Sequence, residues 1–227
     1  MKNKLRPIII TFIGPVGVGK TTQITLLAKY FKNNHSKTKI TYIKCVHGLT
    51  FILNGFIEYI TNLANNNSVE NRNELKKRVF QRITPIWNLI DTLSIASKFL
   101  FSVYIPYQMG YNVLLEEGLL MSIEYYKTFR PYFLGVKPVK LPFLTLLLNW
   151  TKRQRHLDIV LNASTDEVDK RRKSRIFRRF EKEDYENLQR KIISEINDTE
   201  AFKIDTSRKS ISEIHHIIFD KIQKINS

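Results

Sequence analysis

The chain has 227 residues, and its 37 lysine and arginine residues against 21 aspartate and glutamate residues give a net charge of +16. This length fits one large domain or one domain with a lid, and 43% hydrophobic residues exclude a disordered chain. Cys45 is the only cysteine, which excludes an intrachain disulfide and predicts a reducing, cytoplasmic location. The longest apolar runs, Phe99–Met109 and Leu141–Trp150, are too short to span a bilayer, so no membrane partner is expected.

The basic residues are unevenly distributed along the chain. No acidic residue precedes Glu58, and a second basic cluster runs from Lys170 to Arg179. One interpretation is a solvated basic surface, and the other is an anionic partner such as nucleotide phosphates or nucleic acid. Charge alone does not separate these two interpretations.

Apolar strands alternate with helical segments along the chain. Residues 8–13 predict a strand buried on both faces, the apolar spacing over residues 21–31 predicts a helix, and residues 40–46 predict a second strand. These segments form one βαβ unit. Three further strands are expected, over residues 113–117, 158–162 and 201–205.

Helices are expected between and after these strands. Residues 49–110 are mostly helical, whereas the prolines at positions 131, 138 and 142 argue against one long helix over residues 119–150. Ser164 or Thr165 is expected to cap a charged helix, and Ser210 or Ser212 a closing one. The alternation predicts an α/β fold with a five-stranded parallel sheet and helices on both faces, over residues 1–227 as a single domain.

The turn after the first strand carries the most specific motif of the chain. The sequence from Gly14 to Thr21 matches G-x-x-x-x-G-K-[ST] without a mismatch, between a predicted strand and a predicted helix. Glycines let backbone N–H groups converge on phosphate oxygens, while the lysine reaches the terminal phosphates and the hydroxyl binds Mg²⁺. The motif therefore predicts the three-layer sandwich of the P-loop NTPases, with a bound nucleoside triphosphate and Mg²⁺. The nucleotide-binding candidates are Gly14, Gly17, Gly19, Lys20, Thr21 and Thr22.

A carboxylate is expected beside the metal, at the end of a neighbouring buried strand. Glu116 directly follows the apolar run 113–115, so Thr21 and Glu116 are the predicted metal ligands. Glu117 is a second candidate for the carboxylate.

The basic cluster predicts a lid over residues 165–190. Phosphoryl transfer needs cations near the transferring group, and arginines on a closing flap would supply them. The predicted catalytic residues are Lys20 together with Arg175, Arg178 and Arg179. A solvated helix or a nucleic-acid patch is the alternative.

The chain resembles the thymidylate kinase family of nucleoside monophosphate kinases. The resemblance rests on Gly14–Thr22 followed by Gln23, on the strand from Gly110 to Gly118, and on segments 158–171 and 204–214. It implies ATP with Mg²⁺ as the phosphate donor and a small-molecule nucleotide as the substrate. It also places Arg171 against the adenine, with Thr206 near the base. The chain departs from the family pattern at several places. Val16 stands where an acid is usual, Glu117 where an arginine holds the acceptor phosphate, and Cys45-Val46-His47 where the family has Arg-Glu-Pro.

Three functions follow from these patterns. The first is ATP-dependent phosphoryl transfer to a nucleoside monophosphate. The second is a regulatory or nucleic-acid-associated P-loop ATPase without kinase activity, and the third is a nucleoside kinase, whose acceptor needs no arginine at position 117. Residues 47–110 are expected to shape the acceptor pocket and are a candidate homodimer face.

Overall fold

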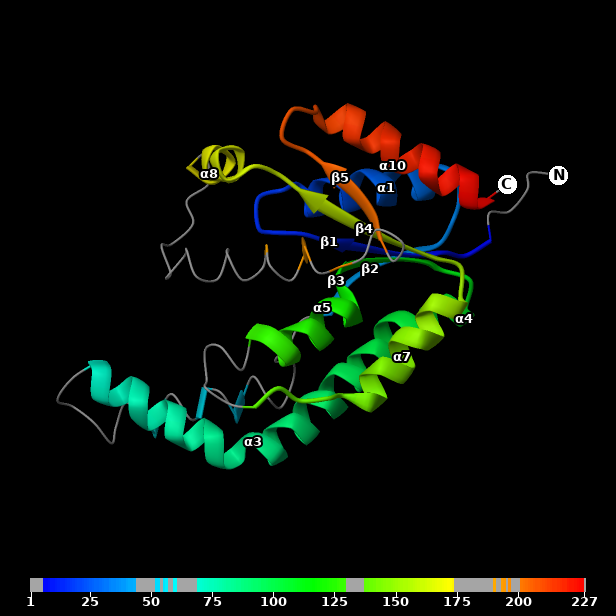
Figure 1. Ribbon diagram of the computed structural model, residues 1–227. Coiled ribbons are helices and arrows are strands. Elements are labelled where there is room, and N and C mark those ends of the chain that lie inside the picture. Colours follow the sequence, from blue (N-terminus) through cyan, green and yellow to red (C-terminus); the bar gives the residue numbers. More distant parts are fainter. Residues whose placement is uncertain are drawn as a thin grey trace. The chain divides into compact units, whose positions relative to one another are not determined.

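A computed structural model describes residues 6–43, 52–53, 55–56, 59–60, 69–129, 137–173, 190, 193–194, 196 and 201–226. The chain divides into two compact units (Figure 1). The first consists of Met1–Tyr42, Phe101–Gly118 and Asn149–Ser227, and the second of Ile43–Leu100 and Leu119–Leu148. The single kinase-like domain over residues 1–227 stays a prediction.

The first unit is built on a five-stranded parallel sheet, as the sequence predicted. The strands lie in the order β2-β3-β1-β4-β5. Their bounds are Ile9–Ile13 for β1, Thr38–Ile43 for β2, Asn112–Glu117 for β3, His156–Asn162 for β4 and Phe202–Asp205 for β5. All five residues of the central strand β1 are buried, which explains why four of them are apolar.

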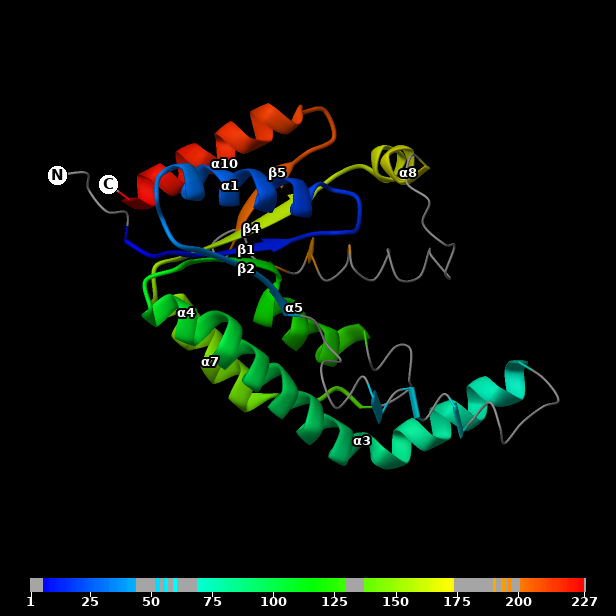
Figure 2. The same cartoon turned by 180° about the vertical axis from the view of Figure 1, so that it is seen from behind.

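Helices cover both faces of this sheet. α1 (Lys20–Asn33) and α10 (Ile211–Asn226) lie on one face, and α4 (Ile105–Gln108) on the other (Figures 1 and 2). Leu27 of α1 and Ile218 of α10 are fully buried in the same core cluster as Phe12 of β1. α8 (Thr165–Lys173) follows β4.

The cap of α10 is a capping box formed by one of the two serines that the sequence offered as caps. The backbone N–H of Ser210 donates to Glu213 Oε2 over 2.7 Å, and the N–H of Glu213 donates to Ser210 Oγ over 3.2 Å. The structure therefore selects Ser210 over Ser212 as the capping residue. At α8, Glu167 instead accepts a hydrogen bond from Arg171.

The second unit is helical in the part that the structure describes. It contains α3 (Val69–Phe99), most of α5 (Gly118–Glu124), the π-helical turn η2 (Tyr125–Phe129) and the start of α7 (Pro142–Arg153). Trp87 packs against Leu53, Val79 and Ile83. The hydroxyl of Tyr126 donates to the buried carboxylate of Asp91. α7 begins at Pro142, where a proline is tolerated because the first helical residue needs no N–H donor.

The helical run of α3 continues through the π-helical segment η1 (Leu100–Tyr104) into α4. Over Gln81–Gln108 it is the one described helix long and apolar enough to cross a membrane, judged by length and composition alone. Helix was predicted over this stretch, but a span of membrane length was not, because polar residues such as Asn88, Asp91 and Lys98 interrupt the apolar run.

Candidate phosphate-binding site

The glycine-rich turn joins the carboxyl end of β1 to the first turn of α1. Gly14 has a φ of +153°, and a Cβ atom there would lie 2.2 Å from the carbonyl oxygen of Leu161 in β4. Only glycine therefore fits at the start of the turn. Gly19 has a φ of +101° and precedes the first residue of α1, Lys20. The turn thus presents the amino end of a helix of 14 residues, which attracts anions.

Lys20 is held inside this turn by the turn's own backbone. Its ammonium group donates to the carbonyl oxygens of Gly14 over 2.7 Å and Pro15 over 3.1 Å. Only 5% of the side chain is exposed. Because a buried cation needs polar partners, these carbonyls fix the ammonium group at the glycine-rich turn.

Glu116 contributes the negative charge of the site. It pairs in register with Phe12 of β1, two residues before Gly14, and its Oε1 lies 3.9 Å from Lys20 Nζ. Its side chain is 28% exposed. The carboxylate of β3 and the lysine of α1 therefore meet at the carboxyl edge of the sheet, as strand order predicts for a ligand site in an α/β fold.

Thr21 and Glu116 have the oxygen donors that Mg²⁺ prefers. Thr21 is exposed at the start of α1, and Glu116 is close to the neighbouring Lys20. The described residues contain no group of three or more histidine, cysteine or acidic side chains that could hold a metal ion. One or two protein oxygens are compatible with Mg²⁺, because this ion is commonly held by a few protein ligands together with substrate phosphates. The residues present thus fit the predicted ion.

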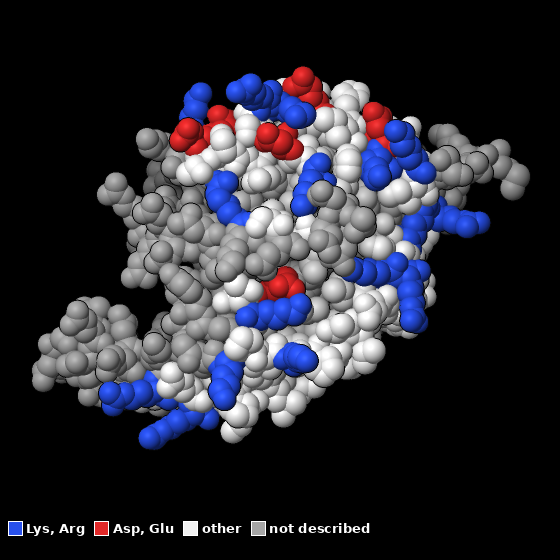
Figure 3. Space-filling model, in the orientation of Figure 1, with Lys and Arg blue, Asp and Glu red and all other residues white. Residues whose placement is uncertain are grey.

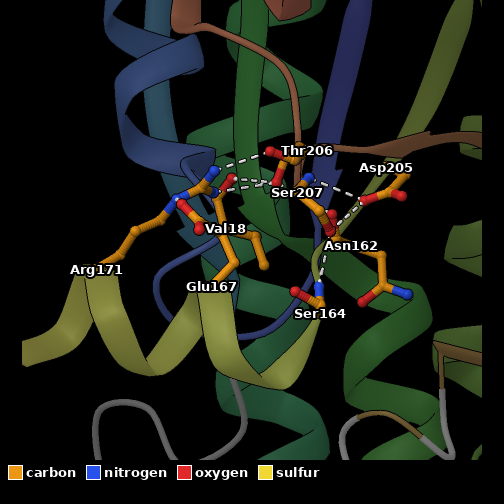
Figure 4. A network of polar contacts seen from close by, with 8 residues as sticks. All are labelled: Val18, Asn162, Ser164, Glu167, Arg171, Asp205, Thr206 and Ser207. Atoms are coloured by element: carbon orange, nitrogen blue, oxygen red, sulfur yellow. Dashed lines mark hydrogen bonds and ion pairs between the residues drawn. The ribbon is translucent and has the colours of Figure 1, made fainter.

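A polar network links the turn to the ends of β4 and β5 (Figure 4). Arg171 of α8 donates to the hydroxyl of Thr206 over 3.2 Å and to its carbonyl oxygen over 2.8 Å. The Thr206 hydroxyl lies 3.0 Å from the carbonyl oxygen of Asn162 and 3.4 Å from that of Val18, inside the turn. Arg171 and Thr206, two predicted nucleotide-binding residues, are therefore in direct contact.

A second set of contacts fixes the loop after β5. Hydrogen bonds from the Ser207 hydroxyl, over 2.7 Å, and the Ser207 N–H, over 2.9 Å, lower the pKa of Asp205. The backbone N–H of Ser164 donates to Ser207 Oγ over 2.8 Å. The sequence analysis did not include Asn162 or Asp205 in the site. Their position at the carboxyl ends of two neighbouring strands is the signal that could have identified them.

Three predicted site residues lie outside the described part of the chain. They are the lid arginines Arg175, Arg178 and Arg179. Of the predicted lid, residues 165–173 and residue 190 are described. Gly14, Gly17, Gly19, Lys20, Thr21, Thr22 and Glu116 all lie in the first unit together with Arg171 and Thr206.

Comparisons with known proteins show which fold carries this site. No protein-family model and no curated relative matches the chain. A thymidylate kinase from Candida albicans with broad substrate specificity matches it with a TM-score of 0.53 at 15% sequence identity, over 99% of this chain and 96% of that chain. A thymidylate kinase from Ehrlichia chaffeensis matches with a TM-score of 0.53 at 14% identity, over 96% of this chain and 99% of that chain. The chain has a thymidylate kinase-like fold, as the resemblance predicted.

Proposed function

We propose that the protein is a P-loop kinase that transfers the γ-phosphoryl group of ATP to a nucleoside monophosphate. The observation that carries this proposal is the position of Lys20, whose ammonium group is fixed by two carbonyl oxygens of the glycine-rich turn and lies 3.9 Å from Glu116. A cation held at the amino end of a helix is suited to stabilise the charge on transferring phosphate oxygens.

Each candidate residue has a role in this proposal. The backbone N–H groups of the turn and Lys20 bind the phosphates, and Arg171 with Thr206 bounds the base. Thr21 and Glu116 would hold Mg²⁺, which supplies positive charge at the β- and γ-phosphate oxygens. The lid arginines add positive charge around the transferred group. Catalysis then rests on positioning and electrostatics.

The test is transfer of the γ-phosphoryl group from ATP, in the presence of Mg²⁺, to a panel of nucleosides and nucleoside monophosphates. Lys20→Ala should lower turnover by about 10²- to 10³-fold, because a donor aimed at developing charge is lost. Lys29→Ala is the matched control, since Lys29 is an exposed lysine of the same helix. Full activity of Lys20→Ala would contradict the mechanism.

A nucleoside acceptor is the second candidate, and Glu117 is the observation that favours it. Glu116 and Glu117 are adjacent carboxylates at the carboxyl end of β3, so they place negative charge at the ligand edge of the sheet. Two like charges a few ångströms apart repel each other strongly where water is partly excluded. A monophosphate dianion would meet this repulsion, whereas an uncharged nucleoside would not.

The same panel separates the acceptors. Transfer to thymidine monophosphate would support the first candidate and would require a cation from elsewhere in the fold. Transfer only to unphosphorylated acceptors would support the nucleoside kinase. ATP binding without transfer to any acceptor would favour the regulatory or nucleic-acid-associated ATPase, whose nucleic-acid binding should weaken steeply with added salt.

A further inference from the structure

The guanidinium group of Arg190 contacts the end of β4 from a position 27 residues further along the chain. Its Nη1 donates to the carbonyl oxygen of Ala163, the first residue after β4, over 2.9 Å. Its Nη2 is buried and has no hydrogen-bond partner among the residues that the structure describes. The described part of the protein therefore holds one half of the guanidinium group and provides no acceptor for the other half.

An unpaired buried N–H group is unusual in a folded protein. Most buried polar atoms have a partner, because burial without one loses the hydrogen bonds that water supplies. The loss is larger for arginine, whose guanidinium group is always charged. Since the Arg190 side chain as a whole is only partly buried, the group lies close to the surface. A small rotation about its terminal bonds would bring Nη2 to a bound ligand, and this rotation breaks no hydrogen bond between Nη2 and a described residue.

The end of β4 lies against the glycine-rich turn. Val18 in the turn and Asn162 in β4 are joined through Thr206, whose hydroxyl is 3.4 Å from the carbonyl oxygen of Val18 and 3.0 Å from that of Asn162. Figure 4 shows these three residues next to one another. Ala163 directly follows Asn162, so its contact with Arg190 places that guanidinium group at the same edge of the sheet as the turn.

Arg171, a second arginine at this edge, uses its nitrogen atoms on the protein. Nε donates to Glu167 over 2.9 Å, Nη1 to the Thr206 hydroxyl over 3.2 Å and Nη2 to the Thr206 carbonyl oxygen over 2.8 Å. Each of its three guanidinium nitrogens thus has a partner within the protein. Both arginines and the turn belong to the first compact unit. Of these two arginines, Arg190 is the one with a nitrogen available to a ligand.

We propose that Arg190 is a further nucleotide-binding residue, whose Nη2 donates to a phosphate oxygen of the nucleotide at the glycine-rich turn. Nη1 stays on the carbonyl oxygen of Ala163, so the protein orients the guanidinium group for the ligand. An anionic oxygen is the acceptor that a charged N–H binds most strongly, which favours the phosphates over the uncharged base. The inference rests on the proposed function in one respect, namely that ATP binds at this turn.

A purely structural role for Arg190 makes a different prediction. In that role the contact with Ala163 only fixes the end of β4, which also holds Thr206. Its loss would then weaken binding of the base, which Arg171 and Thr206 are proposed to bound, and would leave phosphate binding unchanged. Adenosine and inorganic tripolyphosphate, which represent the two halves of ATP, therefore distinguish the two roles.

The test is isothermal titration calorimetry of the full chain with ATP, tripolyphosphate and adenosine, in the presence of Mg²⁺. The net charge of +16 attracts any anion, and Figure 3 shows lysine and arginine side chains spread over the visible face rather than gathered at one place. Arg190→Lys controls for this attraction because it keeps the charge, although lysine lacks the planar fork that serves two acceptors. Arg190→Met removes the charge and both donors.

Arg190→Met should weaken the binding of ATP and of tripolyphosphate by roughly 10- to 100-fold, which is the contribution of a hydrogen bond to a charged group. Arg190→Lys should weaken both by a smaller factor, and neither variant should change the binding of adenosine. Arg153→Met is the matched control, since Arg153 is an exposed arginine of α7 in the same unit. This control loses the same charge and should bind all three ligands as the wild type does.

Circular dichroism follows the fold of each variant, and Arg190→Lys decides the question if Arg190→Met does not fold. Unchanged tripolyphosphate binding in a folded Arg190 variant would overturn the proposal, and a loss confined to adenosine would assign Arg190 a structural role instead. Lys20→Ala keeps the two proposals apart. If it loses affinity for ATP while the Arg190 variants do not, only this inference fails. If the wild type does not bind ATP, the proposed function fails as well.

Discussion

Gly118 follows the two acids at the end of β3 and has a φ of +75°. A Cβ atom at this position would lie 2.7 Å from Cγ2 of Thr11 in β1, far inside van der Waals contact. Gly118→Ala should therefore lower the free energy of unfolding by about 1–3 kcal/mol, through backbone strain and a steric clash together. Urea denaturation at equilibrium measures this loss.

Gly110→Ala separates the two causes. Gly110 has a φ of +83°, but no atom lies within 4 Å of an added Cβ. This variant should lose only about 1–2 kcal/mol, the cost of a left-handed conformation for an L-residue. Thr11→Ser removes the clashing methyl group and should restore part of the stability of Gly118→Ala. Equal losses for the two alanine variants would contradict the steric explanation.

At the scale of single residues, local motifs were predictable and long-range contacts were not. Lys20 and Thr21 could be named as candidates because eight consecutive residues match the motif of a phosphate-binding turn, and Glu116 because it follows a buried apolar run. The contact of Arg171 with Thr206 joins segments 35 residues apart. No spacing rule in the sequence specifies such a contact, and only the family resemblance pointed to it.

α1 and α10 are held together by polar as well as apolar contacts. Gln23 of α1 donates through Nε2 to the carbonyl oxygen of Ile211 over 3.0 Å, and its Oε1 lies 3.3 Å from Nδ1 of His215. Burial lowers the pKa of His215, and the nearby His216 adds to this effect. Burial between the two helices therefore disfavours the protonated imidazole.

This pKa shift makes the stability of the helix pair depend on pH. The unfolded chain binds a proton at His215 before the folded chain does, so the free energy of unfolding falls as pH decreases from about 7 through the unfolded pKa and towards the lower folded value. Thermal unfolding of His215→Gln and wild type between pH 8 and pH 5 measures this effect. The stability advantage of the wild type over the variant should shrink on acidification.

His216→Gln is the control on the same helix, because His216 is exposed. This substitution removes only the smaller of the two causes of the lowered pKa of His215, so its stability difference from wild type should change less over the same pH range than that of His215→Gln. The interpretation fails if the two histidine variants show the same dependence on pH.

At the scale of elements, a helix or strand could be predicted where the burial of its faces leaves a distinct pattern of apolar residues in the sequence. The strand over residues 158–162 was predicted within two residues of β4, because strands covered on both faces are mostly apolar, as Ile159, Val160 and Leu161 are here. α7 was not located because its run of leucines fits a helix and a buried strand equally. The exposure of Phe101 was also missed, since composition does not reveal which apolar side a neighbouring segment covers.

All nucleotide-binding candidates fall in one of the two compact units, although that unit is assembled from three separate segments of the chain. Ligand binding stabilises only the part of a protein that must be folded to form the site. At an ATP concentration of about 100 times Kd, with Mg²⁺, the gain should be about 2.7 kcal/mol. For a domain of this size, the unfolding temperature should rise by roughly 5–10 °C.

Calorimetry of the whole chain, with and without ATP, shows where this gain occurs. If the two units unfold separately, only the transition of the unit with Lys20 and Glu116 should move. EDTA should reduce the shift, because the oxygens of Thr21 and Glu116 then have no Mg²⁺ to bind together with the phosphates. Lys20→Ala should abolish most of the shift, whereas Lys29→Ala should retain it. A shift of equal size in Lys20→Ala would place ATP elsewhere and would remove the basis for assigning this turn to the phosphates.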